Sequence, residues 1–294
     1  MNKQDIVIIG AGPAGIATAI QLRRCGFSPV LLEKSRIGGL LVNANLVENY
    51  PGFPKGISGM SLVRLFEAQL ERTGQKIDFE EVLQLDYNDD FIIRSSKQTL
   101  RSKIVVIASG TRPREIDLPA EAADKIFYEI SPIACVEGKK IAIIGAGDAA
   151  FDYALNLSRN NDVVILNRSN ALKCLLLLWE RVQKSERISY HGQARIKTIK
   201  SAADGLTLRC ESPQGEWELQ ADYAIFAIGR TAVLDYFSQR IKGQIADLEK
   251  NGLLYFVGDV KNDIYRQTSI AVGEGIHAAM KIYRKLQVTD SCKS

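Results

Sequence analysis

Near its start the chain reads Asp5-Ile-Val-Ile-Ile-Gly10-Ala-Gly12-Pro-Ala-Gly15, and helix-forming residues continue to Arg24. Gly10 allows a tight turn, Gly12 lets the backbone approach a pyrophosphate, and Gly15 lets a helix pack closely on the preceding strand. The N-terminus of such a helix offers free N–H groups and the positive end of its dipole to an anion. The stretch therefore predicts a strand, turn and helix that bind a dinucleotide.

A carboxylate follows at the distance expected for a ribose. The strand-like run Pro29-Val-Leu-Leu-Glu33 ends in an acid 18 residues after Gly15. That is close to the roughly 20-residue spacing at which an acid accepts the ribose hydroxyls. The combination favours a ligand site over a glycine-rich turn that binds nothing.

The same pattern returns near the middle of the chain. Lys140-Ile-Ala-Ile-Ile-Gly145-Ala-Gly147-Asp-Ala-Ala150 repeats the strand, turn and helix, with alanine as the third small residue. Two nucleotide cofactors are therefore predicted. Two redox nucleotides in one chain suggest an electron relay between them.

Composition restricts the class of protein. The 294 residues are 46% hydrophobic, enough for two modest cores, and the net charge of +4 argues against a dedicated nucleic-acid binder. The sequence shows no secretory signal and no apolar run of membrane-spanning length, so we expect a cytoplasmic protein without a membrane span. The leucine-rich run 175–179 is expected to form one buried helix face.

The thiols and imidazoles form no recognisable site. No Cys-x-x-Cys or zinc motif joins the scattered residues Cys25, Cys135, Cys174, Cys210 and Cys292. The two histidines, His191 and His277, have no partner at a catalytic or metal-binding spacing, so neither receives a role. We expect no metal.

Alternation of strand-like and helix-like segments predicts an α/β fold with parallel sheets. The strand-like runs are residues 5–9, 29–33, 103–108, 140–144, 162–166, 222–228 and 253–257. The second fingerprint lies between two strands that we assign to one domain. We therefore expect two Rossmann-like, three-layer dinucleotide-binding domains: a discontinuous first domain, residues 1–113 and 230–294, and an inserted second domain, residues 114–229.

Several longer motifs point to one family. They are Gly10-Ala-Gly-Pro-Ala-Gly15, Ile37-Gly-Gly-Leu40, Val47-Glu-Asn-Tyr-Pro-Gly-Phe-Pro54, Ala108-Ser-Gly110, Gly145-Ala-Gly-Asp-Ala-Ala150, Val257-Gly-Asp259 and Ile264-Tyr-Arg-Gln-Thr268. With them the chain resembles the low-molecular-weight thioredoxin reductase superfamily of two-dinucleotide flavoproteins over nearly its whole length. The resemblance implies FAD in the first domain and a nicotinamide dinucleotide in the inserted one, and we expect a homodimer.

The resemblance also implies the residues around FAD. These are Gly10, Gly12, Pro13, Ala14, Gly15, Glu33, Lys34, Gly39, Leu40, Asn49, Val82, Ala108, Ser109, Gly110, Gly258, Asp259, Arg266, Gln267 and Thr268. Arg266, Gln267 and Thr268 are expected to begin a helix whose N-terminus stabilises negative charge on a reduced flavin.

Charge after the strand-like run 162–166 favours NADPH over NADH. No acid is present there to bind a ribose diol, whereas Arg168 and Lys173 resemble cations of the family's His-Arg-Arg-x-x-x-Arg motif, with Ser169 replacing one arginine. The expected nicotinamide-cofactor site comprises Gly145, Gly147, Asp148, Ala149, Ala150, Asn167, Arg168, Lys173 and Gly229. NADH, or no dinucleotide at this site, are the alternatives.

The chain departs from the family at the redox-active Cys-x-x-Cys. The corresponding positions, 17 and 14 residues before Gly145, hold Tyr128 and Ser131, which cannot form a disulfide. No catalytic residue is assigned. Tyr128 is the candidate for a residue close to the flavin, and an inter-domain packing role is its alternative.

These features resemble most closely the dithiol-free, thioredoxin-reductase-type ferredoxin/flavodoxin–NADP reductases. They predict an FAD-dependent NAD(P)H oxidoreductase that passes electrons to a protein carrier such as ferredoxin or flavodoxin. One alternative is a reductase of a separate disulfide or quinone partner. Another is a flavin-binding sensor or assembly subunit without turnover.

Overall fold

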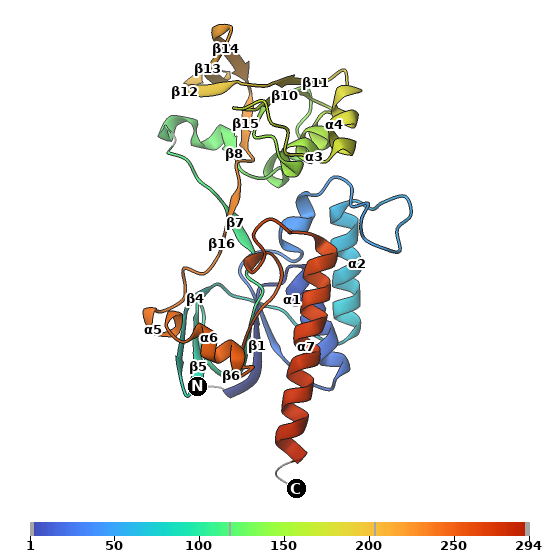
Figure 1. Ribbon diagram of the computed structural model, residues 1–294, viewed down its shortest axis with the longest axis vertical. Helices are drawn as coiled ribbons and strands as arrows, with labels where there is room; N and C mark the ends of the chain where they lie inside the picture. The colour runs from blue at the N-terminus through green and yellow to red at the C-terminus, as the bar shows by residue number, and fades with distance from the viewer. Residues whose placement is uncertain (1–2, 118, 203, 292–294) are drawn as a thin grey trace. The chain divides into compact units, whose positions relative to one another are not determined.

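The computed structural model describes residues 3–117, 119–202 and 204–291, which divide into two units (Figure 1). The first unit comprises Met1–Val42, Glu48–Arg112 and Thr231–Ser294, and the second comprises Asn43–Val47 and Pro113–Arg230. The short segment Asn43–Val47 groups with the second unit although both of its chain neighbours belong to the first. The sequence-based boundaries did not include this segment in the inserted domain.

The first unit is built on a mixed sheet with β1 at its centre. Its strands are β1 (Lys3–Ile9), β2 (Val30–Glu33), β3 (Asp78–Phe79), β4 (Val82–Asn88), β5 (Asp90–Ser95), β6 (Thr99–Ile107) and β17 (Leu254–Phe256). β1 pairs in parallel with β2 and β6, and β17 pairs in parallel with the C-terminal part of β6. β4 and β5 continue the sheet in antiparallel order from the other part of β6. Residues 6–9 of β1 are all buried, as expected for a central parallel strand covered on both faces.

Helices cover one face of this sheet. They are α1 (Pro13–Arg24), α2 (Gly59–Arg72) and α7 (Thr268–Ser291), and α7 lies alongside α1 (Figure 1). Proline at the first position of α1 suits a helix start, and the hydroxyl of Ser58 caps α2 by accepting from the N–H of Ser61 at 3.2 Å. A Cβ at Gly275 would lie 2.3 Å from the carbonyl oxygen of Ala14, so glycine permits the close approach of α7 to α1.

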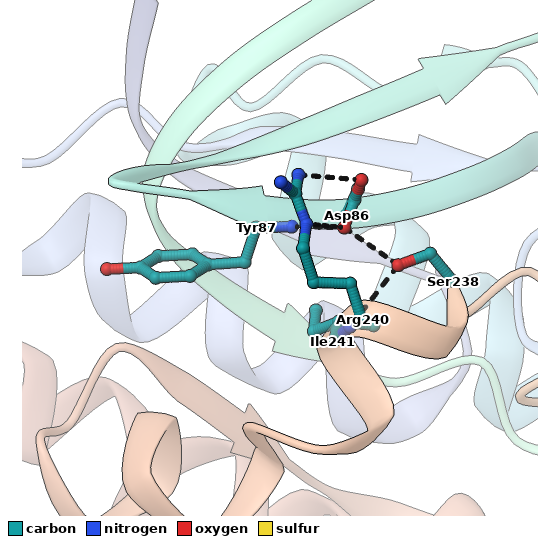
Figure 2. Close-up of polar contacts among 5 residues, drawn as sticks. All are labelled: Asp86, Tyr87, Ser238, Arg240 and Ile241. Atoms are coloured by element: carbon teal, nitrogen blue, oxygen red, sulfur yellow. Dashed lines mark hydrogen bonds and ion pairs between the residues drawn. The ribbon is translucent and has the colours of Figure 1, made fainter.

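The opposite face is covered by the return segment with α5 (Gln239–Lys242) and α6 (Ile245–Lys250). The segment is attached to β4 through the backbone of Leu85, whose N–H donates to Tyr236 at 2.7 Å. Beside this contact, the Asp86 carboxylate accepts hydrogen bonds from Arg240 Nε at 3.0 Å and from the Ser238 hydroxyl at 2.7 Å (Figure 2). The hydrogen bond from Arg240 holds the pKa of Asp86 below its usual value.

The second unit contains a fully parallel sheet in the order β11-β10-β9-β15-β8. Its elements are β8 (Ile126–Phe127), β9 (Lys140–Ile144), α3 (Asp148–Leu157), β10 (Asp162–Leu166), α4 (Leu176–Gln183), β11 (Ile188–His191) and β15 (Tyr223–Phe226). Helices α3 and α4 pack on one face. An antiparallel sheet of β12 (Arg195–Ala202), β13 (Gly205–Ser212) and β14 (Gly215–Ala221) packs on the other.

The remaining elements are short. β7 (Thr111–Pro113) pairs with β16 (Arg230–Ala232), and 3-10 turns occur at Gly39–Asn43, Ala120–Lys125, Ser131–Ile133 and Gly258–Val260. Within the part of the chain that the structure describes, no helix has the length and apolar character needed to cross a bilayer.

The expectation of one buried helix face at residues 175–179 is wrong. Leu175, Leu176 and Leu177 are 59%, 69% and 46% exposed, and only Leu178 and Trp179 pack against the α3 side of the core. The reason is that α4 begins only at Leu176, and consecutive residues of a helix point in directions about 100° apart, so five successive residues cannot all face one core.

We predict that Asp86→Asn lowers the free energy of unfolding by about 1 kcal/mol at neutral pH, because it weakens a charge-assisted bond to a half-exposed arginine. The folded-state pKa of Asp86 is depressed, so its stabilisation is present above the unfolded-state pKa and is lost as the pH falls through the folded-state pKa. Urea unfolding should therefore show the two proteins converging below about pH 4.

The matched control is Asp5→Asn, which removes the exposed ion pair with Lys103 and should cost less than about 0.5 kcal/mol. A difference in the free energy of unfolding between wild type and Asp86→Asn that stays constant from neutral to acidic pH would contradict the role given to the Asp86 carboxylate.

Candidate dinucleotide sites

The first glycine-rich turn has the geometry of a phosphate loop. Gly10 has φ +106°, and a Cβ there would lie 2.3 Å from the carbonyl oxygen of Ala108. A Cβ at Gly15 would lie 1.9 Å from the carbonyl oxygen of Gly10. At Gly12, by contrast, a Cβ would meet no protein atom within 4 Å. The backbone at Gly12, at the start of α1, is therefore open to a bound group, while the other two glycines are required by packing.

Glu33 lies at the end of β2 beside this turn. It is 8% exposed, and its carboxylate accepts the N–H of Ala11 at 2.8 Å and the N–H of Ser35 at 3.0 Å. A carboxylate accepts about four hydrogen bonds, so acceptor capacity is left for ribose hydroxyls. The bond to Ala11 was not anticipated from the sequence, and it makes Glu33 a support of the turn itself. Lys34, next in the chain, is exposed.

Other residues predicted around FAD converge on the same turn. A Cβ at Gly39 would lie 3.5 Å from the Cα of Gly12, and a Cβ at Gly258 would lie 2.8 Å from the Cβ of Ala14. The remaining ones lie at Pro13 in the first turn of α1, Leu40 in the turn after Gly39, Val82 at the start of β4, Ala108, Ser109 and Gly110 after β6, and Asp259 beside Gly258. The structure thus gathers them into the first unit.

The segment before α7 is more elaborate than expected. Asn49 donates to Gln267 at 2.9 Å and its carbonyl accepts from the hydroxyl of Ser269 at 3.0 Å. α7 begins at Thr268, and Gln267 is its N-cap, because the carbonyl of Gln267 accepts the N–H of Ala271 at 3.0 Å. The expectation that Arg266 belongs to the start of the helix is wrong. Arg266 instead donates from Nε to the carbonyl of Asn262 at 3.0 Å and from its N–H to the carbonyl of Ile264 at 3.1 Å, so it belongs to the loop before the helix.

The sequence did not indicate a role for Glu274, which lies in the second turn of α7. Its carboxylate accepts the N–H of Gly258 at 2.7 Å and the side-chain amide of Asn262 at 3.1 Å. The turn that carries Asp259 is thereby fixed to α7. An acid separated by 15 residues from Asp259 gives no local signal of this contact.

The second glycine-rich turn repeats the first. Gly145 has φ +139°, and a Cβ there would lie 2.4 Å from the carbonyl oxygen of Ala227, whereas a Cβ at Gly147 would meet nothing within 4 Å. Lys173 lies beside this turn, because its N–H donates to Ala146 at 3.1 Å and it forms a parallel bridge with Gly147. The backbone of Lys173 therefore lies against the middle of the second glycine-rich turn.

The other residues predicted around the nicotinamide cofactor are near this turn or at the ends of neighbouring strands. Asp148 accepts the N–H of Leu175 at 2.8 Å. Asn167 is 5% exposed, and its side chain is used locally, donating to Tyr190 at 2.9 Å. Arg168 is exposed; Ala149 and Ala150 lie in the first turn of α3, and Gly229 accepts the N–H of Arg114 at 3.0 Å.

Tyr128 and Ser131 are held by contacts of their own unit. The Tyr128 ring packs 6.1 Å from that of Phe226, and its oxygen accepts the N–H of Ile116 at 3.2 Å. Asn43 accepts the N–H of Ser131 at 3.2 Å and donates to Glu129 at 3.1 Å. The contacts of Tyr128 lie within the second unit, so they bear on neither its expected place near the flavin nor its alternative role between the domains. Asn43 holds Glu129 and Ser131 through its side-chain amide.

Asp152 in α3 anchors the segment Asn43–Val47. Its carboxylate accepts the N–H of Asn45 at 2.8 Å. Burial raises the pKa of Asp152 to about 6, although hydrogen bonds from the backbone of Asn45 and Leu46 and the charge of Arg159 oppose the rise. Asp148 adds a smaller upward contribution to the same pKa.

The cysteines of the described residues, Cys25, Cys135, Cys174 and Cys210, are all free thiols. Cys210 is buried between strands of the antiparallel sheet and Cys135 is exposed. In the described part of the chain, no three His, Cys, Asp or Glu side chains cluster as metal ligands would.

Comparisons with known proteins agree on one family. A family model described as pyridine nucleotide-disulphide oxidoreductase matches residues 4–275. A thioredoxin reductase of Streptomyces clavuligerus is 31% identical over 310 residues, covering 97% of this chain and 94% of the relative. NADPH-dependent thioredoxin reductase 3 of Arabidopsis thaliana is 29% identical, covering 96% of this chain and 58% of the relative. The crystal structure of Lactococcus lactis thioredoxin reductase matches with a TM-score of 0.85 at 26% identity, covering 96% of this chain and 98% of the other.

The comparisons confirm the predicted α/β fold with two Rossmann-like dinucleotide-binding domains and the resemblance to the thioredoxin reductase superfamily. They do not confirm the finer resemblance to the dithiol-free reductases. The predicted ferredoxin or flavodoxin acceptor is wrong, because the relatives that match nearly the whole chain are thioredoxin reductases. The missing cysteines at 128 and 131 exclude thiol exchange at those positions, and they carry no information about which protein accepts the electrons.

We predict that Gly12→Val leaves the cofactor-free protein folded, with a free energy of unfolding within about 1 kcal/mol of wild type, because its Cβ direction is open. Its side chain would fill the space that a pyrophosphate needs, so FAD retention on purification should fall at least about tenfold. Gly15→Ala is the contrasting variant. It should destabilise the cofactor-free protein by about 2 kcal/mol or more through its backbone clash. Stoichiometric FAD in purified Gly12→Val would contradict this assignment.

Asp152→Asn should increase stability at neutral pH. The folded state keeps a proton on Asp152 to about pH 6, whereas the unfolded chain releases it near pH 4, so stability falls as the pH rises through this window. Asparagine keeps an oxygen for the Asn45 N–H without the buried charge. Urea unfolding should show the variant more stable at pH 7 by on the order of 2 kcal/mol, with little difference at pH 4. A variant that is less stable than wild type at pH 7 would show that the charge itself is needed.

Proposed function

The chain belongs to the pyridine nucleotide-disulphide oxidoreductase family, and we propose that it passes electrons from NADPH, through bound FAD, to a protein disulfide. Flavin-dependent oxidation of a pyridine nucleotide, the general activity, follows from membership of the family. The predicted cofactors, FAD and NADPH, are those that thioredoxin reductases of this family use. The observation that carries the proposal is the pair of glycine turns, each open at its central glycine and each at the carboxyl ends of parallel strands.

FAD fits the first unit on the evidence of the open Gly12 backbone and the acceptor capacity left on Glu33. Gly10 and Gly15 hold the turn, Gly12 and the start of α1 bind the pyrophosphate, and Glu33 accepts the adenosine ribose hydroxyls. Asp259, fixed through Gly258 to Glu274, accepts ribityl hydroxyls. Bound FAD supplies hydride acceptance from a nicotinamide and storage of two electrons.

NADPH fits the second unit in the corresponding way. The N-terminus of α3 and the open backbone at Gly147 receive the pyrophosphate, and Lys173 adds a positive charge beside the turn. Arg168, exposed at the end of β10, binds the adenosine side of the cofactor. No protein acid or base is required for a hydride transfer, so the task of these residues is to bind and orient.

The acceptor is proposed from the names of the relatives, which reduce thioredoxin. The balance is one NADPH, one proton and one partner disulfide giving NADP⁺ and two partner thiols. Because Tyr128 and Ser131 supply no sulfur, both sulfur atoms of the reaction belong to the partner. Hydrogen bonds between Asn43 and both Glu129 and Ser131 hold this segment, which contains no dithiol that could exchange with the partner.

Incubation of the FAD-loaded protein with NADPH and oxidised thioredoxin tests the proposal, with new thiols counted against NADPH consumed. We expect one disulfide reduced per NADPH. The double variant Tyr128→Cys, Ser131→Cys should accelerate the reaction by about tenfold or more, because an internal dithiol replaces a bimolecular encounter at the flavin. Tyr128→Phe, Ser131→Ala is the matched control and should stay near the wild-type rate. Complete flavin reduction by NADPH without thiol formation in any of the proteins would exclude thioredoxin as the acceptor.

A further inference from the structure

The loop after β10 is fixed to the turn after β11. The N–H of Asn167 donates to the carbonyl of His191 at 2.9 Å, and the N–H of Ala194 donates to the carbonyl of Asn167 at 2.9 Å. The N–H of Gln193 donates to Ser169 at 3.3 Å. Arg168 lies between these contacts in the chain. Residues 167–169 and 191–194 therefore form one corner at the carboxyl end of the parallel sheet.

His191 belongs to the side of the sheet that faces the antiparallel strands. It is in register with Leu166, whose side chain packs in the core on that side, and paired residues of adjacent strands share a face. The imidazole stacks on Trp217 of β14, with ring centroids 5.0 Å apart and an interplanar angle of 37°. Arg168 lies in a bend two residues after β10, and both of its chain neighbours, Asn167 and Ser169, are hydrogen-bonded to the backbone of residues 191–194.

The two segments that form the corner contain cations and no acid. Residues 167–179 and 188–200 contain no Asp or Glu, and Arg168 and His191 are both exposed there. The backbone of Lys173 is bonded to the glycine turn at Ala146 and Gly147. His191, at the end of β11, places a second nitrogen donor at this corner.

We infer that His191 is a specificity-determining residue for NADPH, whose imidazole N–H donates to the 2′-phosphate bound by Arg168. The inference rests on the proposed binding of the nicotinamide cofactor in the second unit. Stacking on Trp217 restricts the imidazole before the ligand arrives, which reduces the entropy lost on binding. Sequence reasoning gave His191 no role because it lies 23 residues after Arg168 and only strand pairing brings the two together.

Binding of adenosine 2′,5′-bisphosphate and of adenosine 5′-monophosphate to the FAD-loaded protein tests this, by isothermal titration calorimetry without turnover. In wild type the bisphosphate should bind at least about tenfold more tightly, since only it carries the 2′-phosphate. His191→Ala should lower the affinity for the bisphosphate by about fivefold to tenfold and change the affinity for the monophosphate by less than about twofold.

His191→Phe distinguishes loss of the N–H donor from loss of the ring contact, because phenylalanine can still pack on Trp217 but has no N–H. It should lose as much bisphosphate affinity as His191→Ala. Lys197→Ala, which removes a cation already paired with Glu211 at 3.0 Å, is the charge control and should leave both affinities unchanged.

The outcomes are distinct. The role of His191 is overturned if the histidine variants lose affinity for the two ligands equally. It is also overturned if both variants keep the wild-type affinity for the bisphosphate. Full affinity in His191→Phe with a loss only in His191→Ala also overturns it, because the ring rather than the donor would then matter. Failure of wild type to bind either ligand would instead contradict the proposed cofactor site of the second unit.

Discussion

The close approach of a glycine turn to the end of the neighbouring parallel strand is the constraint on which each unit depends. In the first unit, β1 enters its turn so near to the end of β6 that a side chain at Gly10 would collide with the carbonyl of Ala108. In the second unit the same relation holds between Gly145 and Ala227. This approach sets the following helix on its sheet and leaves the middle glycine of each turn as the open one.

What surrounds each turn then determines what it can hold. The first turn has a buried carboxylate, Glu33, bonded to its own backbone, and the second has Lys173 in the corresponding neighbourhood of its glycines. An acid suits ribose hydroxyls, and a cation suits phosphate. The two turns thus have the same backbone geometry and different neighbours: a buried acid at the first turn, and both Lys173 and Asp148 at the second.

The fold and the phosphate loops could be predicted because their signals are local: spaced glycines, apolar strands and an acid at a fixed spacing. Long-range contacts could not. Nothing near Asn43 indicates that residues 43–47 pack with a unit that begins some 70 residues later, and nothing near His191 indicates Arg168. The exposure of Leu175 to Leu177 was missed because a run of leucines does not show which turn of a helix is covered by the core. The acceptor was predicted wrongly because the absence of cysteines at positions 128 and 131 excludes thiol exchange there but does not identify the protein that accepts the electrons.

An anaerobic titration of the FAD-loaded protein with NADPH, followed by flavin absorbance, tests the central claim that one chain relays electrons between two nucleotide sites. One NADPH carries two electrons, the capacity of one FAD. With no Cys-x-x-Cys in the chain to take up a second pair, we predict complete bleaching at one equivalent. A flavin that stays oxidised in excess NADPH would contradict the relay, and a requirement for two equivalents would show that a disulfide of this chain shares the electrons.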